Sequence, residues 1–159
     1  MALGQCLRRS RGPLPAVAWS GVQPGGPETS LVGLDCYSGD LLWQAAGKEA
    51  EKFGIKPIIL SDRIEGEARE VAKVHAAIAK QIKHRDQPIH APALILTGGE
   101  TTVTVSGNGK GGRNTEFVLS LLEALQGEEG IAAIAVDTDG IDGTENNAGA
   151  WIDENSFFK

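Results

Sequence analysis

Three runs of apolar residues, each of strand length, are separated by segments with helical periodicity. The runs lie within residues 56–60, 93–97 and 131–136. Each is apolar at consecutive positions rather than at alternate ones, which is typical of parallel strands covered on both faces. Strands that alternate with helices along a chain indicate an α/β fold. We therefore expect a layered sheet of mainly parallel strands with helices on both faces.

Three helices are predicted between and before these strands. Apolar residues three and four positions apart predict a helix over residues 65–83, with His75 on its apolar face as a packed side chain. Residues 40–53 form a second predicted helix, and a third begins at Asn114 or Thr115 and ends at Gly127.

Shorter elements are expected around the second and third apolar runs. Gly98 and Gly99 should end the second strand, and the alternating threonines and valines of residues 101–106 should form a strand of their own. Residues 151–152 should begin another strand.

The amino end differs in composition from the rest of the chain. Residues 1–27 contain three arginines, no acidic residue and four of the seven prolines. The prolines interrupt any amphipathic helix, so a mitochondrial presequence is disfavoured. We expect residues 1–38 to be a poorly ordered or non-native tail and residues 39–159 to be the α/β domain. The two cysteines require no disulfide in a domain of this size, which favours a cytoplasmic protein.

The charge of the chain limits its partners. Fifteen basic and 21 acidic residues give a net charge of −6, which argues against a nucleic-acid-binding protein. No apolar run approaches the roughly 18 residues that a membrane span needs. The remaining class of partner is a small molecule.

Polar clusters follow each of the three apolar runs. They are Ser61-Asp62, residues 98–102 and residues 137–143. Ligands of open α/β sheets bind beyond the carboxyl ends of the strands, so these clusters should meet at one ligand-binding edge. Each cluster alone is also compatible with simple turn chemistry.

The glycine-rich segment 107–114 predicts an anion-binding loop. Glycines allow close backbone approach to a ligand, and the following helix offers free N–H groups at its amino end. Lys110 adds a point charge and Arg113 a bidentate fork for carboxylate or phosphate. A flexible connector with solvated charges is the alternative. The segment fits a dinucleotide fingerprint only formally, because the strand predicted before it is threonine-rich and alternating rather than buried, and it fails the P-loop pattern.

Asp137, Asp139 and Asp142 are candidate ligands for Mg²⁺ bound together with a phosphate oxygen, since this ion prefers oxygen ligands. The three histidines and two cysteines have no zinc-binding spacing, and no Ser-His-Asp arrangement can be recognised.

Taken together, residues 97–105, 109–116, 137–143 and 148–150 resemble the carboxyl-terminal MOFRL domain of the type 2 glycerate kinases. The stretch Ile58–Glu70 is similar to the region just upstream of it, so that the resemblance covers about residues 45–155. Some members of this family have been labelled hydroxypyruvate reductases. The resemblance implies a kinase that phosphorylates D-glycerate with ATP and Mg²⁺, in a cleft between two domains.

The resemblance also implies roles for individual residues. Arg113, Glu100 and Asp139 would be catalytic, and Asp137 and Asp142 would hold the metal. The substrate or phosphates would be bound by Gly98, Gly99, Gly109, Lys110, Gly111, Gly112 and Asn114.

Members of this family are much longer and carry a separate amino-terminal domain with an active-site lysine. We therefore expect a carboxyl-terminal fragment, truncated at its own carboxyl end, that lacks this domain and is inactive alone. Two alternatives stay open: a non-catalytic anion-binding α/β module, and a nicotinamide-dependent hydroxypyruvate reductase.

Overall fold

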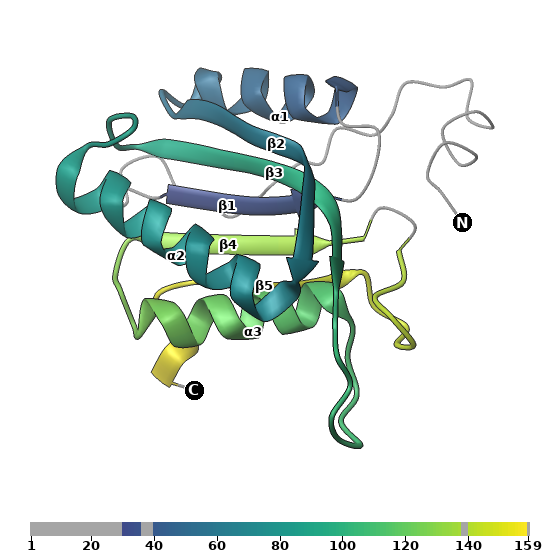
Figure 1. Ribbon diagram of the computed structural model, residues 1–159. Coiled ribbons are helices and arrows are strands. Elements are labelled where there is room, and N and C mark those ends of the chain that lie inside the picture. The colour runs from purple at the N-terminus through teal and green to yellow at the C-terminus, as the bar shows by residue number, and fades with distance from the viewer. Residues whose placement is uncertain (1–29, 36–39, 138–139, 159) are drawn as a thin grey trace.

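The computed structural model describes residues 30–35, 40–137 and 140–158, with side chains from residue 46 onward. It forms one five-stranded sheet in the order β2-β3-β1-β4-β5 (Figure 1). Its elements, in chain order, are β1 (Ser30–Asp35), α1 (Asp40–Lys52), β2 (Lys56–Glu67), α2 (Ala68–Arg85), β3 (Ala93–Thr102), α3 (Arg113–Leu125), β4 (Ile131–Val136), β5 (Gly149–Ile152) and a 3-10 turn (Ser156–Phe158).

Four strands of the sheet are parallel, and β5 alone pairs in the antiparallel sense, with β4. Helix α1 lies on one face of the sheet, and α2 and α3 lie side by side on the other (Figure 1). Right-handed crossovers explain this division. The chain moves one way across the sheet from β1 to β2, and the opposite way from β2 to β3 and from β3 to β4. The predicted α/β class, with mainly parallel strands and helices on both faces, is confirmed.

Strand β3 separates two apolar cores because its successive side chains point to opposite faces. Ala93 and Ile95 are buried in the large core beneath α2 and α3. Leu94 and Leu96 are buried in a smaller core with Ala50 of α1. Both faces of this strand are therefore covered, as its continuous apolar run predicts.

Helices α2 and α3 pack through the predicted apolar faces. Helix α2 contributes mainly alanines to the core, and α3 contributes Phe117 and Leu121. His75 is also buried between the two helices. Its Nδ1–H donates to the Val71 carbonyl oxygen at 2.8 Å, and its ring meets Phe117 edge-on at 5.3 Å between centroids. His75 is a packed side chain, as expected.

Three details differ from the sequence predictions. The separate strand predicted over residues 101–106 does not form, because residues 101–102 are the end of β3 and residues 103–106 are in no strand. Strand β2 continues through Glu67, so residues 65–67 are not helical. Strand β3 runs through Gly98 and Gly99 instead of ending there. At Gly99, with φ +151°, a Cβ atom would lie 2.0 Å from the carbonyl oxygen of Ile64 in β2. The glycine thus permits a close approach of two strands and does not break one.

The structure also extends the domain toward the amino end. Residues 30–35, which the sequence prediction placed in a tail, form β1 and pair with both β3 and β4 at the centre of the sheet. This strand completes the parallel sheet, because β3 and β4 do not pair with each other. The other residues of the predicted tail, 1–29 and 36–38, lie outside the described residues.

Candidate functional site

Arg113, the first residue of α3, lies between two carboxylates at the carboxyl ends of the parallel strands. Its Nη1 donates to Glu100 Oε1 at 2.8 Å, and its Nη2 donates to Asp137 Oδ2 at 2.7 Å. Glu100 is in β3, and Asp137 directly follows β4. The guanidinium therefore bridges the sheet edge at which the sequence predicts a ligand site.

Asp137 is fixed in place more firmly than its position in a loop suggests. Its side chain is almost fully buried. Its backbone N–H donates to the Ala148 carbonyl oxygen at 2.6 Å, and its own carbonyl accepts from Gly140 N–H at 3.2 Å. These contacts hold the start of the loop between β4 and β5 against the end of the sheet.

Asp142 holds the same loop against the amino end of α3. Its Oδ1 accepts from the backbone N–H and side-chain amide of Asn114, at 2.9 and 3.2 Å. Its Oδ2 accepts from the backbone N–H and hydroxyl of Thr115, at 2.8 and 2.6 Å. The carboxylate is fully buried and serves as a cap for the helix from a distant part of the chain.

Gly112 and Gly143 allow the segment between β3 and α3 to pack closely against the loop after β4. A Cβ atom on Gly112 would lie 2.3 Å from Asp142 Oδ1, and one on Gly143 would lie 2.9 Å from the Gly111 carbonyl oxygen. The segment after β3 and the loop after β4 therefore meet through backbone atoms. We refer to Asp142 with its partners Asn114 and Thr115 as the aspartate latch.

The predicted binding residues fall into two groups. Arg113 and Asn114 lie at the sheet edge with Glu100, Asp137 and the aspartate latch, and Gly98 and Gly99 lie within β3. The segment between β3 and α3 extends away from the body of the domain (Figure 1). It carries Gly109, Lys110 and Gly111, all exposed. Asp139 lies outside the described residues.

Comparison with known proteins shows which family this part of the chain resembles. The model of the MOFRL family matches residues 93–159, which include β3, Glu100, Arg113, Asp137 and Asp142. Residues 93–159 belong to the MOFRL family. This segment contributes Arg113 and its described carboxylate partners, Glu100 and Asp137.

Relatives of the chain include glycerate kinases. Over 104 residues it is 42% identical to the D-glycerate 2-kinase of Thermotoga maritima, covering 65% of this chain and 25% of that protein. Over 118 residues it is 51% identical to an Agrobacterium vitis protein provisionally named a hydroxypyruvate reductase, covering 73% of this chain and 27% of that protein. A solved Thermotoga maritima glycerate kinase matches with a TM-score of 0.64 at 38% identity, over 72% of this chain and 28% of that one.

The chain therefore spans a minor part of its relatives. It covers between 25% and 42% of the length of the first curated proteins that it matches.

Sequence reasoning missed one residue beside the MOFRL segment. Glu67, the last residue of β2, accepts hydrogen bonds from the Thr104 hydroxyl at 2.7 Å and the Thr104 N–H at 3.1 Å, and from the Thr102 hydroxyl at 3.4 Å. The bond from the Thr104 hydroxyl is the main reason that the pKa of Glu67 is lowered. The signal was present in the sequence: an acidic residue ends one strand, and threonines alternate at the end of the next. Glu67 ties the start of the protruding segment to β2.

The two described carboxylates that were predicted to hold a metal, Asp137 and Asp142, already have partners within the protein. Asp137 pairs with Arg113, and both oxygens of Asp142 accept hydrogen bonds from α3. Within residues 30–35, 40–137 and 140–158, no three histidine, cysteine or acidic side chains gather as a metal site would need. The assignment of Asp137 and Asp142 as ligands of Mg²⁺ stays a prediction.

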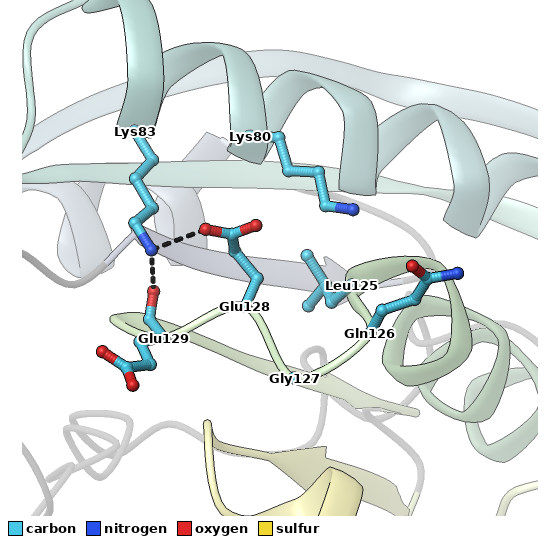
Figure 2. A pocket seen from close by; sticks show the side chains of 7 residues that line it. All are labelled: Lys80, Lys83, Leu125, Gln126, Gly127, Glu128 and Glu129. Carbon is cyan, nitrogen blue, oxygen red and sulfur yellow. Dashed lines mark hydrogen bonds and ion pairs between the residues drawn. The ribbon is translucent and has the colours of Figure 1, made fainter.

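A hollow of about 360 Å³ lies at the other end of α3, away from Arg113 (Figure 2). It is lined by residues of α2, by the last residue of α3 and by the loop that follows: Lys80, Lys83, Leu125, Gln126, Gly127, Glu128 and Glu129. Lys80 Nζ donates to the Ala124 carbonyl oxygen at 2.8 Å, and Lys83 Nζ donates to Glu128 Oε1 at 2.7 Å and to the Glu129 carbonyl oxygen at 2.6 Å. The bond from Lys83 lowers the pKa of Glu128. These lysines stabilise the carboxyl end of α3, where cations are favoured.

None of the helices that the structure describes is both long and apolar enough to cross a membrane.

Proposed function

We propose that this chain forms one wall of the active site of an ATP-dependent D-glycerate kinase. The observation that carries the proposal is the position of Arg113. It places a guanidinium fork at the carboxyl edge of a parallel sheet and at the start of a helix. The relatives named glycerate kinases support the reaction class.

The chemistry of phosphoryl transfer suits this residue. Such a reaction needs positioning of two substrates and neutralisation of charge on several oxygens at once. D-Glycerate carries a carboxylate, and ATP carries phosphates, and a guanidinium binds either anion through two parallel hydrogen bonds. In this proposal Arg113 binds an anionic oxygen, and the amino end of α3 with Asn114 adds N–H donors.

The glycines, Lys110 and Asp139 keep the roles that the sequence suggests. Glycines of the protruding segment, with Lys110, would approach the phosphates, and Gly98 and Gly99 would shape the edge beneath them. Asp139 would lie in the same cleft. Mg²⁺ would supply further charge neutralisation when bound. A cytoplasmic location belongs to the same proposal.

A second domain would supply the opposite wall of the cleft. The relatives are more than twice as long as the part that this chain matches. The described residues provide one arginine and several acidic side chains on one side of the site. We therefore infer that the 159-residue chain binds anions but does not transfer phosphate alone.

Binding of inorganic phosphate, ATP and D-glycerate, measured by calorimetric titration, tests the proposal. We expect Arg113→Ala to weaken binding by about tenfold or more, since hydrogen bonds to charged groups contribute about 1.5–3 kcal/mol. Lys110→Ala should weaken it by less than about threefold, because an exposed point charge contributes less.

Arg113→Lys distinguishes the bidentate geometry of the guanidinium from its positive charge. The variant keeps the charge and should still lose most of the affinity. Arg85→Ala is the matched control, because Arg85 is an exposed arginine at the far end of α2. Equal effects of Arg113→Ala and Arg85→Ala would remove Arg113 from the site. Binding of NADH in place of ATP would favour the reductase instead.

A further inference from the structure

The two carboxylates that hold Arg113 differ strongly in exposure. The Asp137 side chain is 3% exposed, whereas the Glu100 side chain is 69% exposed, and Arg113 lies between them at 28%. The bond to Asp137 is thus shielded from water, and the bond to Glu100 is open to it. Exposed ion pairs contribute little, so the contact with Glu100 is the one that breaks easily.

The surroundings of Glu100 also weaken its ion pair with Arg113. Glu65 of β2 stands directly beside Glu100 in the parallel register, and both are exposed acidic residues. Like charges in adjacent positions of a sheet repel. Asp137, by contrast, is anchored through its backbone to Ala148 and Gly140. Glu100 can therefore turn away from Arg113 while Asp137 keeps the guanidinium in place.

We infer that Glu100 occupies the position of the anionic ligand on Arg113 and that the ligand displaces it on binding. This inference rests on the proposed anion-binding role of Arg113. A carboxylate or phosphate oxygen of a substrate makes the same bond to Nη1 that Glu100 Oε1 makes at 2.8 Å. Glu100 then sets the affinity of the site by competing for the guanidinium, a role different from the catalytic one that the sequence suggests.

If Glu100 competes with the anion, changing Glu100 should raise the affinity for the anion. Changing a residue that binds the anion should lower it. Glu100→Gln replaces a charged acceptor by a neutral one, so residue 100 holds Nη1 of Arg113 less strongly. Anions should then bind more tightly. A group that contacts the substrate or the reacting atoms would give weaker binding or lower turnover when changed.

The test is a titration of inorganic phosphate into the wild-type chain and into Glu100→Gln, followed by calorimetry and by the amide NMR signals of α3. We expect Glu100→Gln to tighten phosphate binding by up to about fivefold, the range of an exposed ion pair. Glu65→Gln is the matched control, because it removes the same charge from the neighbouring strand. It should tighten binding by less than about twofold.

The outcomes separate this inference from the proposed function. If phosphate binds the wild-type chain and Arg113→Ala abolishes binding, but Glu100→Gln weakens binding or leaves it unchanged, Glu100 is not a competitor and the inference is wrong. Equal tightening by Glu100→Gln and Glu65→Gln also overturns it, because it indicates a general charge effect. If neither the wild-type chain nor Glu100→Gln binds phosphate, both the inference and the anion-binding role of Arg113 fail.

Discussion

Replacing Asp142 by alanine removes the aspartate latch and should destabilise the domain substantially. The carboxylate accepts four hydrogen bonds, two from backbone N–H groups of α3 and two from side chains. The backbone donors of Asn114 and Thr115 lose their partner, at about 1–2 kcal/mol each for a lost helix cap. The amide and hydroxyl side chains, which can turn toward other partners, add roughly 1 kcal/mol.

We therefore expect Asp142→Ala to lower the free energy of unfolding by about 4 kcal/mol, a large share of the 5–15 kcal/mol typical of a domain. Asp142→Asn keeps one acceptor oxygen but turns an NH₂ group toward the other donors, so its loss should be about half as large. Urea unfolding, followed by circular dichroism, measures both values.

Asp62→Ala is the control, because Asp62 is an exposed aspartate whose ion pair with Arg63, at 3.6 Å, is also exposed. It should change the free energy of unfolding by less than about 0.5 kcal/mol. A loss below about 1 kcal/mol for Asp142→Ala would refute the reasoning, since it would mean that water satisfies the end of α3 without the latch.

Three further results are expected. Burial is the main reason that the pKa of His75 is lowered from 6.5, so the unfolded chain binds more protons there, and stability should fall as the pH drops below about 6.5. In urea unfolding, His75→Leu should lose less stability between about pH 7.5 and pH 5.5 than the wild type, and an equal loss would contradict this. Gly99→Ala should destabilise the domain by about 1–3 kcal/mol, because its Cβ meets the Ile64 backbone, whereas Gly109→Ala, with open space around it, should not; thermal unfolding compares the two. The purified chain should not phosphorylate D-glycerate with ATP in a coupled assay, and measurable turnover would show that one wall of the cleft suffices.

The sheet edge could be predicted from sequence because it depends on a general rule. Parallel strands have their carboxyl ends at the same edge of the sheet, so residues 98–102 and 137–143 were expected at one edge whatever the order of the strands. Arg113 then belonged to this edge, because it opens the helix that follows β3. Its described carboxylate partners, Glu100 and Asp137, were among the residues predicted for the site.

The latch and the strand order could not be predicted in the same way. Helix-capping patterns are local, and the local capping position of α3 is Gly112, which has no side chain to accept a hydrogen bond. Asp142 caps the helix from 28 residues away, a contact that only the tertiary fold creates. Likewise, a pair of glycines indicates a turn unless a neighbouring strand is known to press against it, as β2 does at Gly99.

The place of β1 in the sheet bears on how the chain reaches its native state. Residues 93–159 contain β3 and β4, yet these strands are separated by the width of β1, roughly 10 Å between their axes. Without residues 30–35 the sheet would divide into a β2-β3 pair and a β4-β5 pair, each with an open inner edge. The central pairings join residues about 60 and 100 positions apart, as in Leu31 with Leu94 and Ser30 with Ile131. Such non-local contacts carry a high loop-closure entropy and slow folding, so we expect closure of the sheet around β1 to be a late step. Until it occurs, the two inner edges are sites where another chain can pair.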